Sequence, residues 1–267
     1  MSGARERLLV APRDAPSGAV LLDVYRSDRE TPPVAGITGA PVVDVIAELS
    51  GEEGAWTLPE PRAFETRIRS WGITADSPVV IHATEFSTAT RAWFALRWAG
   101  VIDVRILEGT PQSWPEPWSG EPFEIRPGSL PVLDAAQAAE AADRGLLLDG
   151  RSGLDYLGEA PEKGQVLESS GHIPGSTWAP SFELARNGRL LPAGELRRWL
   201  LRVGVIGVSP VGAYCGTSIG SSALVFAMAT WGLELPLFVG SLRGWIAEGR
   251  PVVSGGSGPI LRAGDRC

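Results

Sequence analysis

Short apolar runs alternate with longer amphipathic stretches along the chain. The short runs have the composition of β-strands and occupy 20–24, 78–82, 104–107, 146–149, 211–214 and 237–240. Helices are predicted at 136–144, 193–203 and 221–231. In the second of these helices the apolar residues recur at i, i+3, i+4 and i+7, on one face: Leu196, Trp199, Leu200 and Val203. Strands alternating with helices predict the α/β class, with mostly parallel sheets flanked by helices on both faces.

A repeated order of landmarks divides the chain in two. The run SPVVIHA at 77–83 resembles SPVGAYC at 209–215, and a polar loop and an apolar helix follow each run. Upstream, LLDVYRS at 21–27 resembles LLLDGRS at 146–152. The stretch between the two copies is rich in proline and glycine, as linkers are. We therefore predict one domain at 1–120, a linker at 121–130 and a second domain at 131–267.

Composition and charge narrow the function classes. The 267 residues include 24 basic and 31 acidic side chains, for a net charge of −7, which disfavours nucleic acid as a partner. No apolar run approaches the ~18 residues of a membrane span and no signal peptide is recognisable, so we expect a cytoplasmic protein without a membrane partner. The chain has two cysteines, Cys215 and Cys267, and two histidines, so we expect no disulfide framework, metal site or cofactor.

Cys215 is the candidate nucleophile. It follows an apolar run and precedes a short loop and a helix, and the small or polar residues after it are Gly216, Thr217, Ser218, Ile219, Gly220 and Ser221. Loop N–H groups and a helix N-terminus favour the thiolate form of a cysteine in this position. The matching position of the first copy is Ala83, so the fold does not need a cysteine there. We therefore favour a reactive Cys215 over a buried core cysteine.

Four segments in order resemble the tandem-domain rhodanese-type sulfurtransferases, the family of thiosulfate and 3-mercaptopyruvate sulfurtransferases. They are LLDGRSGLDYLGE at 147–159, GHIPGS at 171–176, CGTSIGS at 215–221 and GSLRGW at 240–245. The resemblance implies two parallel-sheet domains, an inactive first copy, and Cys215 facing a cleft between them. It also implies a Cys215 persulfide that takes sulfur from a small anionic donor and passes it to cyanide, a thiol or a protein acceptor.

The resemblance also suggests roles for other residues. Arg151 matches the family position that reaches the anionic end of the donor, whereas Asp149 and His172 match structural positions. Because Gly216 and Thr217 are neutral, the loop resembles the 3-mercaptopyruvate type more than the thiosulfate type.

The loop departs from the usual 3-mercaptopyruvate pattern at two positions. Ser218 replaces a glycine, and Gly220 replaces a threonine. A positive φ is costly for serine, so we predict that Ser218 limits activity toward ordinary mercaptopyruvate-type donors. Outside the loop, Asp155 and Trp56 stand where some family members carry an arginine and a histidine.

Two alternatives remain beside the enzyme. A cysteine phosphatase needs Cys-x5-Arg, and the seventh position here is Ser221, which disfavours that chemistry. A degenerate rhodanese pair that acts as a non-catalytic binding or sulfur-carrier module fits the changes at Ser218 and Gly220. Retention of Cys215 and Arg151 argues for the enzyme.

Overall fold

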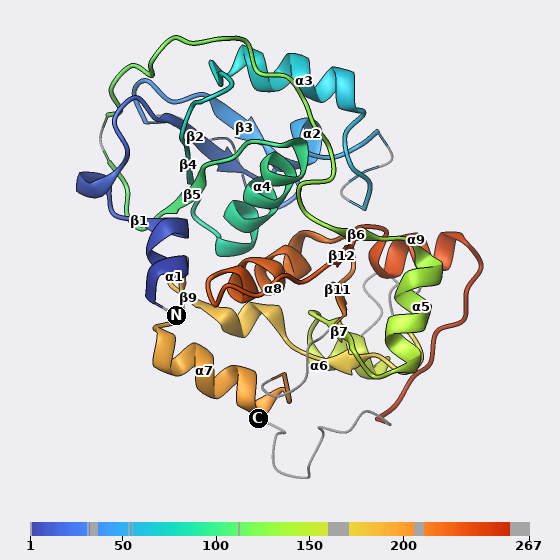
Figure 1. The fold of residues 1–267 in the computed structure, drawn as a ribbon. Coiled ribbons are helices and arrows are strands. Elements are labelled where there is room, and N and C mark those ends of the chain that lie inside the picture. The colour runs from blue at the N-terminus through green and yellow to red at the C-terminus, as the bar shows by residue number, and fades with distance from the viewer. Residues whose placement is uncertain are drawn as a thin grey trace.

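Two five-stranded sheets organise the protein (Figure 1). The computed structural model describes residues 2–30, 32, 37–52, 54, 56–111, 113–159, 171–205 and 211–256. Within both sheets the paired strands of the described chain run parallel. Parallel sheets flanked by helices confirm the predicted fold class.

The first sheet has the strand order β1-β5-β4-β2-β3. Its strands are β1 (Leu9–Val10), β2 (Val20–Tyr25), β3 (Val42–Asp44), β4 (Val79–His82) and β5 (Val104–Leu107). The helices that accompany it are α1 (Ser2–Leu8), α2 (Val45–Glu48), α3 (Pro61–Ser70) and α4 (Phe86–Ala99), with a 3-10 turn at Pro12–Asp14. We call the chain through β5 the N-terminal half.

The second sheet has the order β6-β12-β11-β7-β8, which matches the first sheet strand for strand. Its strands are β6 (Val132–Leu133), β7 (Leu147–Asp149), β8 (Thr177–Trp178), β11 (Gly212–Tyr214) and β12 (Leu237–Phe238), and β9 (Ala185–Arg186) and β10 (Arg189–Leu190) form a separate hairpin. Its helices are α5 (Ala135–Asp143), α6 (Gly153–Leu157), α7 (Ala193–Arg202), α8 (Ile219–Ala229) and α9 (Ser241–Ala247), with a 3-10 turn at Ser181–Leu184. We call the chain from β6 onwards the C-terminal half.

Helices α4 and α8 join the two halves. Figure 1 shows them side by side between the sheets, and they pack on one another more extensively than any other pair of helices in the described chain. Almost every side chain of both helices is buried, which explains why neither helix has a continuous polar face. One continuous hydrophobic core, including Leu22 of β2 and Leu237 of β12, runs through both halves. The α4–α8 contact is therefore part of the core of the molecule.

The predicted strands at 20–24, 78–82, 104–107, 146–149, 211–214 and 237–240 are confirmed, each with ends within two residues of the prediction. The three predicted helices correspond to α5, α7 and α8, and α8 begins two residues earlier than predicted. The proposed linker 121–130 lies between β5 and β6, and the domain boundaries remain a prediction. The first two residues of the SPVGAYC run, Ser209 and Pro210, lie outside the described residues, as does Cys267.

Candidate functional site

Cys215 lies at the carboxyl end of β11, four residues before the first residue of α8. Carboxyl ends of parallel strands are where α/β proteins place their sites. The cysteine is 6% exposed and is not part of a disulfide within the described chain. Ala83 directly follows β4, the strand at the matching place in the first sheet. The predicted strand–loop–helix setting of Cys215 is therefore present.

The loop after Cys215 turns at Ser218, which has φ 68° and ψ −12°. This is the left-handed conformation, which glycine adopts without strain and which residues with a Cβ rarely adopt. The Ser218 carbonyl accepts hydrogen bonds from the Ser222 N–H at 3.1 Å and the Ser222 hydroxyl at 2.9 Å. The turn is thus built into the start of α8, and serine adopts it despite its Cβ.

Ser221 brings a hydroxyl to the cysteine sulfur. Its Oγ lies 3.5 Å from Sγ of Cys215 and 3.2 Å from the Ser218 carbonyl, so the single hydroxyl proton serves one of these acceptors at a time. Gly220 has no side chain beside the sulfur, and a Cβ there would lie 3.6 Å from Sγ. Ser221 therefore supplies a hydroxyl near the sulfur although Gly220 replaces the usual threonine.

The start of α9 holds the backbone of the cysteine from behind. The Leu242 N–H donates to the Cys215 carbonyl at 2.9 Å, and the Arg243 N–H donates to the Gly216 carbonyl at 3.2 Å. The Cys215 N–H donates to Oγ of Ser241 at 3.3 Å. Three hydrogen bonds from one segment fix the orientation of the peptide that carries the nucleophile.

Cys215 lines a cavity of about 830 Å³ between the two halves. Five other predicted site residues, all from the C-terminal half, line it as well: Arg151, Gly216, Thr217, Ile219 and Gly220. From the N-terminal half come Arg26, Asp28, Arg29, Thr84, Glu85, Phe86 and Ser87. Ser218 and Ser221 are fully buried and are not among the lining residues, so the serine at 218 does not narrow the cavity. The cleft that the sequence suggests is thus present at Cys215.

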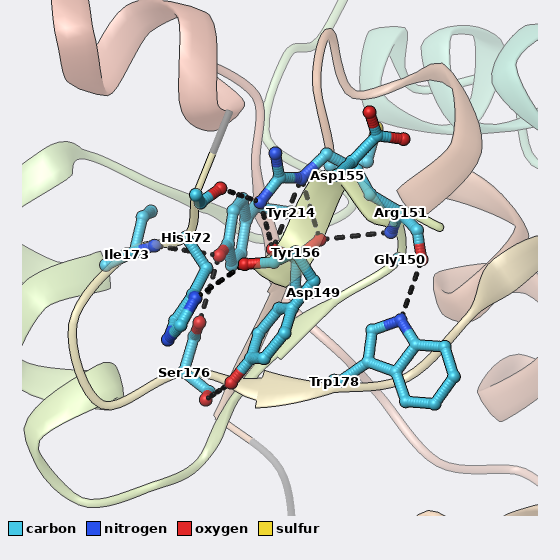
Figure 2. A network of polar contacts seen from close by, with 12 residues as sticks. Asp149, Gly150, Arg151, Asp155, Tyr156, His172, Ile173, Ser176, Trp178 and Tyr214 are labelled. Atoms are coloured by element: carbon cyan, nitrogen blue, oxygen red, sulfur yellow. Dashed lines mark hydrogen bonds and ion pairs between the residues drawn. The ribbon is translucent and has the colours of Figure 1, made fainter. Parts of the chain in front are cut away.

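Arg151 lines this cavity but is already engaged by Asp149, as Figure 2 shows. Its Nε lies 3.0 Å and 3.2 Å from the two carboxylate oxygens, and its Nη2 lies 2.6 Å from Oδ2. The same Nη2 donates to the Gly171 carbonyl at 2.6 Å. Burial lowers the pKa of Arg151, but Asp149 outweighs burial and holds that pKa above its ordinary value. That Arg151 also contacts the donor remains a prediction.

A buried polar network supports the Arg151 segment (Figure 2). The Tyr156 hydroxyl donates to the Ser176 carbonyl at 2.8 Å, and His172 stacks on the Tyr156 ring and contacts its carbonyl through Nδ1 at 2.7 Å. The Tyr214 hydroxyl accepts from the Ile173 N–H at 3.0 Å. Burial, reinforced by Asp149, raises the pKa of Tyr156 to about 12 and the pKa of Tyr214 well above its ordinary value. His172 thus fixes a turn, as the sequence suggests.

Arg91 is a buried charged residue behind the site, and the sequence analysis gave it no role. It lies on α4, is fully buried, and donates from Nη2 to the Thr57 carbonyl at 3.2 Å. Burial lowers its pKa to about 10, and the negative charge of a Cys215 thiolate acts in the opposite direction. An arginine inside the apolar helix at 86–99 is the signal that could have indicated it. The N-terminal half therefore places a positive charge within electrostatic reach of the cysteine.

Within the described residues, no group of three or more His, Cys, Asp or Glu side chains is arranged to hold a metal ion. None of the helices in the described ranges combines the length and apolar character needed to cross a membrane.

Comparison with known proteins places this geometry in a family. No protein-family model matches the chain. The chain is 32% identical over 242 residues to the "Probable 3-mercaptopyruvate sulfurtransferase" of Pseudomonas aeruginosa, covering 82% of this chain and 84% of that protein. The chain belongs to the thiosulfate/3-mercaptopyruvate sulfurtransferase family. It is also 27% identical over 241 residues to thiosulfate/3-mercaptopyruvate sulfurtransferase 2 of Arabidopsis thaliana, covering 75% of this chain and 69% of the relative.

The fold of this sulfurtransferase resembles that of a solved relative. The 3-mercaptopyruvate sulfurtransferase SseA of Escherichia coli, described as having the rhodanese fold, superposes with a TM-score of 0.69 at 24% identity. The match covers 84% of this chain and 92% of SseA. The family resemblance that the sequence suggested is therefore confirmed, and so is the fold.

Proposed function

We propose that this sulfurtransferase moves a sulfane sulfur from a small anionic donor, through a persulfide on Cys215, to a thiol, cyanide or protein acceptor. The observation that carries the proposal is the placement of Cys215 between β11 and α8, on the wall of a cavity that both halves line. The nucleophile is thus reachable from the cavity while its backbone is held by α9.

In the first step the Cys215 thiolate attacks the sulfur of the donor. With 3-mercaptopyruvate, the new S–S bond forms as the C–S bond breaks, and the carbon takes a proton to leave as pyruvate. With thiosulfate, the bond between the two sulfur atoms breaks and sulfite leaves. The Ser221 hydroxyl, 3.5 Å from Sγ, is placed to donate a hydrogen bond to the charged sulfur.

In the second step the acceptor attacks the outer sulfur of the persulfide. The S–S bond to Cys215 breaks, the Cys215 thiolate is restored, and the sulfur leaves as thiocyanate or as a new persulfide. Covalent catalysis thereby divides one transfer into two displacements at sulfur. No redox partner is needed because the electron pair of each broken bond stays with its leaving group.

We favour a 3-mercaptopyruvate-like donor over thiosulfate. Gly216 and Thr217 line the cavity next to the sulfur and bring no charge. The name of the Pseudomonas aeruginosa relative supports the same preference. Arg151 stays in the proposal as a fixed positive charge whose field reaches Cys215, held in place by Asp149.

We further propose that the two halves are copies of one domain and that the first is inactive. The matching strand orders of the two sheets support the first statement. Ala83 in the place of the cysteine supports the second, since alanine has no nucleophile. In this arrangement the N-terminal half contributes cavity wall and charge, through residues such as Arg29 and Arg91.

Substitution of the cysteine tests the proposal. The wild-type protein is incubated with 3-mercaptopyruvate or thiosulfate, and intact-protein mass spectrometry then measures addition of one sulfur atom, while cyanolysis measures thiocyanate release. We expect Cys215→Ser to abolish both signals and Cys267→Ser to retain both. Persulfide formation without turnover would favour the sulfur-carrier module, and turnover in Cys215→Ser would overturn the mechanism.

A further inference from the structure

Arg243 of α9 stacks on a tryptophan from the other half of the molecule. Its guanidinium carbon lies 4.0 Å from the centroid of the Trp56 ring. A cation at that distance over an indole face is attracted by the ring quadrupole, and indole is the most favourable of the aromatic side chains for this contact. The Arg243 side chain is exposed, yet the stacking restricts where its charge can lie. The contact therefore positions a charge without neutralising it.

Hydrogen bonds hold the segment that carries Trp56. The Thr57 N–H donates to the Gly54 carbonyl at 3.0 Å, and the Thr57 hydroxyl donates to the same carbonyl at 2.9 Å. From α4, Arg91 donates to the Thr57 carbonyl at 3.2 Å. The residue next to Trp56 is thus anchored to the helix that packs against α8. The backbone beside the indole ring is thereby held at the place where the ring meets the guanidinium.

Arg243 also lies close to the nucleophile. Its backbone N–H donates to the carbonyl of Gly216, the residue that follows Cys215. Both Arg243 and Cys215 line the 830 Å³ cavity. A small donor with its sulfur at Cys215 therefore has Arg243 on the wall of the same cavity.

The four arginines that line the cavity differ in whether they form an ion pair. Arg26 is paired with Asp28 at 2.6 Å, and Arg151 is paired with Asp149 at 2.6 Å. Arg29 and Arg243 form no ion pair with any residue in the described part of the chain. Of these two, Arg243 has its position fixed by an aromatic ring and by the backbone of the cysteine loop.

We propose that Arg243 binds the anionic group of the sulfur donor and that Trp56 is the positioning residue that aims the guanidinium into the cavity. This inference rests on the proposed function and names the subsite that recognises the donor. The ligand is a carboxylate or a sulfonate, both of which match the paired N–H groups of a guanidinium. Arg151 is ion-paired with Asp149. We therefore assign to Arg243 the role that the sequence analysis gave to Arg151, which is to bind the anionic group of the donor.

The test measures persulfide formation on Cys215 in single turnovers, as a function of donor concentration, for wild type and for Arg243→Gln, Arg243→Lys and Trp56→Leu. Losing one charged hydrogen-bonding partner should raise the half-saturating concentration of donor roughly ten- to a hundredfold in Arg243→Gln. Arg243→Lys should recover part of the loss because it keeps the charge. Trp56→Leu should raise the same concentration about two- to fivefold. The maximal rate should stay within about twofold of wild type in all three.

Arg250→Gln is the matched control. Arg250 follows α9, stacks on Trp245 at 5.0 Å, and is not among the residues that line the cavity. We expect its half-saturating concentration to equal that of wild type. Discharge of the preformed persulfide by dithiothreitol, which is uncharged, should be unchanged in every variant. Thermal unfolding of each variant checks that the fold is retained.

The outcomes separate the subsite from the function. If the half-saturating concentration of 3-mercaptopyruvate alone rises in Arg243→Gln, the proposal is supported with a carboxylate as the ligand. If that of thiosulfate alone rises, the proposal is supported with a sulfonate as the ligand. If both rise, Arg243 recognises the negative charge of either donor. Equal half-saturation in Arg243→Gln and Arg250→Gln overturns the subsite while leaving the Cys215 persulfide intact. Absence of a persulfide in the wild type with both donors overturns the proposed function itself.

Discussion

Ser218 concentrates backbone strain next to the nucleophile. A residue with a Cβ at φ 68° costs about 1–2 kcal/mol relative to the right-handed region. Ser218 is fully buried, and its carbonyl is tied into the first turn of α8 by Ser222. The packing around the loop therefore enforces a conformation that the residue itself disfavours.

A pair of variants isolates this strain. Ser218→Ala removes the hydroxyl and keeps the Cβ, whereas Ser218→Gly removes both. We expect the glycine variant to be more stable than the alanine variant by about 1 kcal/mol, after allowing for the greater freedom of glycine in the unfolded chain. Urea unfolding of both variants measures the difference.

The same two variants test the sequence hypothesis that Ser218 limits activity. A rise in kcat/KM with 3-mercaptopyruvate in Ser218→Gly, but not in Ser218→Ala, would support it. Equal kcat/KM in the two variants would contradict it, since the loop adopts the left-handed turn in the presence of serine.

Tyr156 makes the stability of the folded protein depend on pH in the alkaline range. Burial raises the pKa of its hydroxyl to about 12, above the ordinary value of 10.0. Between those two values the unfolded chain loses the proton while the folded chain keeps it. Its contribution to stability is therefore complete below pH 10 and is lost as pH rises toward 12.

Tyr156→Phe tests this linkage. The free energy of unfolding of the wild type should fall between pH 10 and 12, and the fall should be shallower in the variant by at most about 1.4 kcal/mol per pH unit. Urea titrations at a series of pH values measure the slopes. The control is Tyr25→Phe, on β2, whose slope of unfolding free energy against pH should remain closer to that of wild type. Identical slopes in wild type and Tyr156→Phe would refute the prediction.

At the scale of single residues, local sequence identified Cys215 and its loop because strand, turn and helix follow one another along the chain. The Arg243–Trp56 contact could not be found that way, since it joins residues far apart in sequence. The engagement of Arg151 by Asp149 needed the fold for a different reason. The two residues are neighbours in the motif, but the motif does not give the direction in which the guanidinium points.

Among the elements, α8 connects the chemistry to the core. Its N-terminus follows the cysteine loop, and its middle packs against α4. Phe226 makes edge-to-face contacts with Trp93 at 5.0 Å and with Phe86 at 5.8 Å between ring centroids. Phe86 also lines the cavity, so the aromatic cluster extends to the wall of the site.

Truncation of the central ring tests the contribution of this contact. Phe226→Ala should lower the free energy of unfolding by about 3–5 kcal/mol, because a fully buried aromatic side chain leaves a cavity. The control is Phe182→Ala, whose ring is 62% exposed and whose loss should change stability by less than about 0.5 kcal/mol. Chemical denaturation measures both variants. An equal loss of unfolding free energy in Phe226→Ala and Phe182→Ala would contradict a special role for the α4–α8 contact.

Element type followed the hydrophobic pattern where runs were long and apolar. The strands β1, β3, β6 and β8 were not predicted. Like β7, β11 and β12, which were predicted, they span only two or three residues, and a run that short has no periodic pattern of its own. The start of α8 was predicted two residues late because Ser218, and not a residue further along, supplies the turn that begins the helix.

The largest apolar core of the described residues spans both halves of the molecule. The largest cluster of buried apolar residues includes Val43 and Ile81 from the first sheet and Ala213 and Leu237 from the second. Opening the α4–α8 contact would expose apolar surface on both sides. Neither half is therefore expected to keep its stability without the other.

We predict that the two halves unfold in a single transition. Thermal melts followed by tryptophan fluorescence and by far-ultraviolet circular dichroism should have the same midpoint, and the calorimetric and van't Hoff enthalpies should agree. The melts need no sulfur donor in the buffer. Two separated transitions, or a stable fold of residues 1–120 expressed alone, would show that the halves are energetically independent.

The stacking of Arg243 on Trp56 means that the site is assembled from two surfaces, which the chain between β5 and β6 joins covalently. On separate polypeptides, each surface would depend on the abundance of the other. A covalent tether replaces that dependence with a fixed effective concentration, in the millimolar range for short connections. Dilution inside a cell therefore cannot disassemble the pocket, and the two surfaces are inherited as one gene product, in fixed one-to-one ratio.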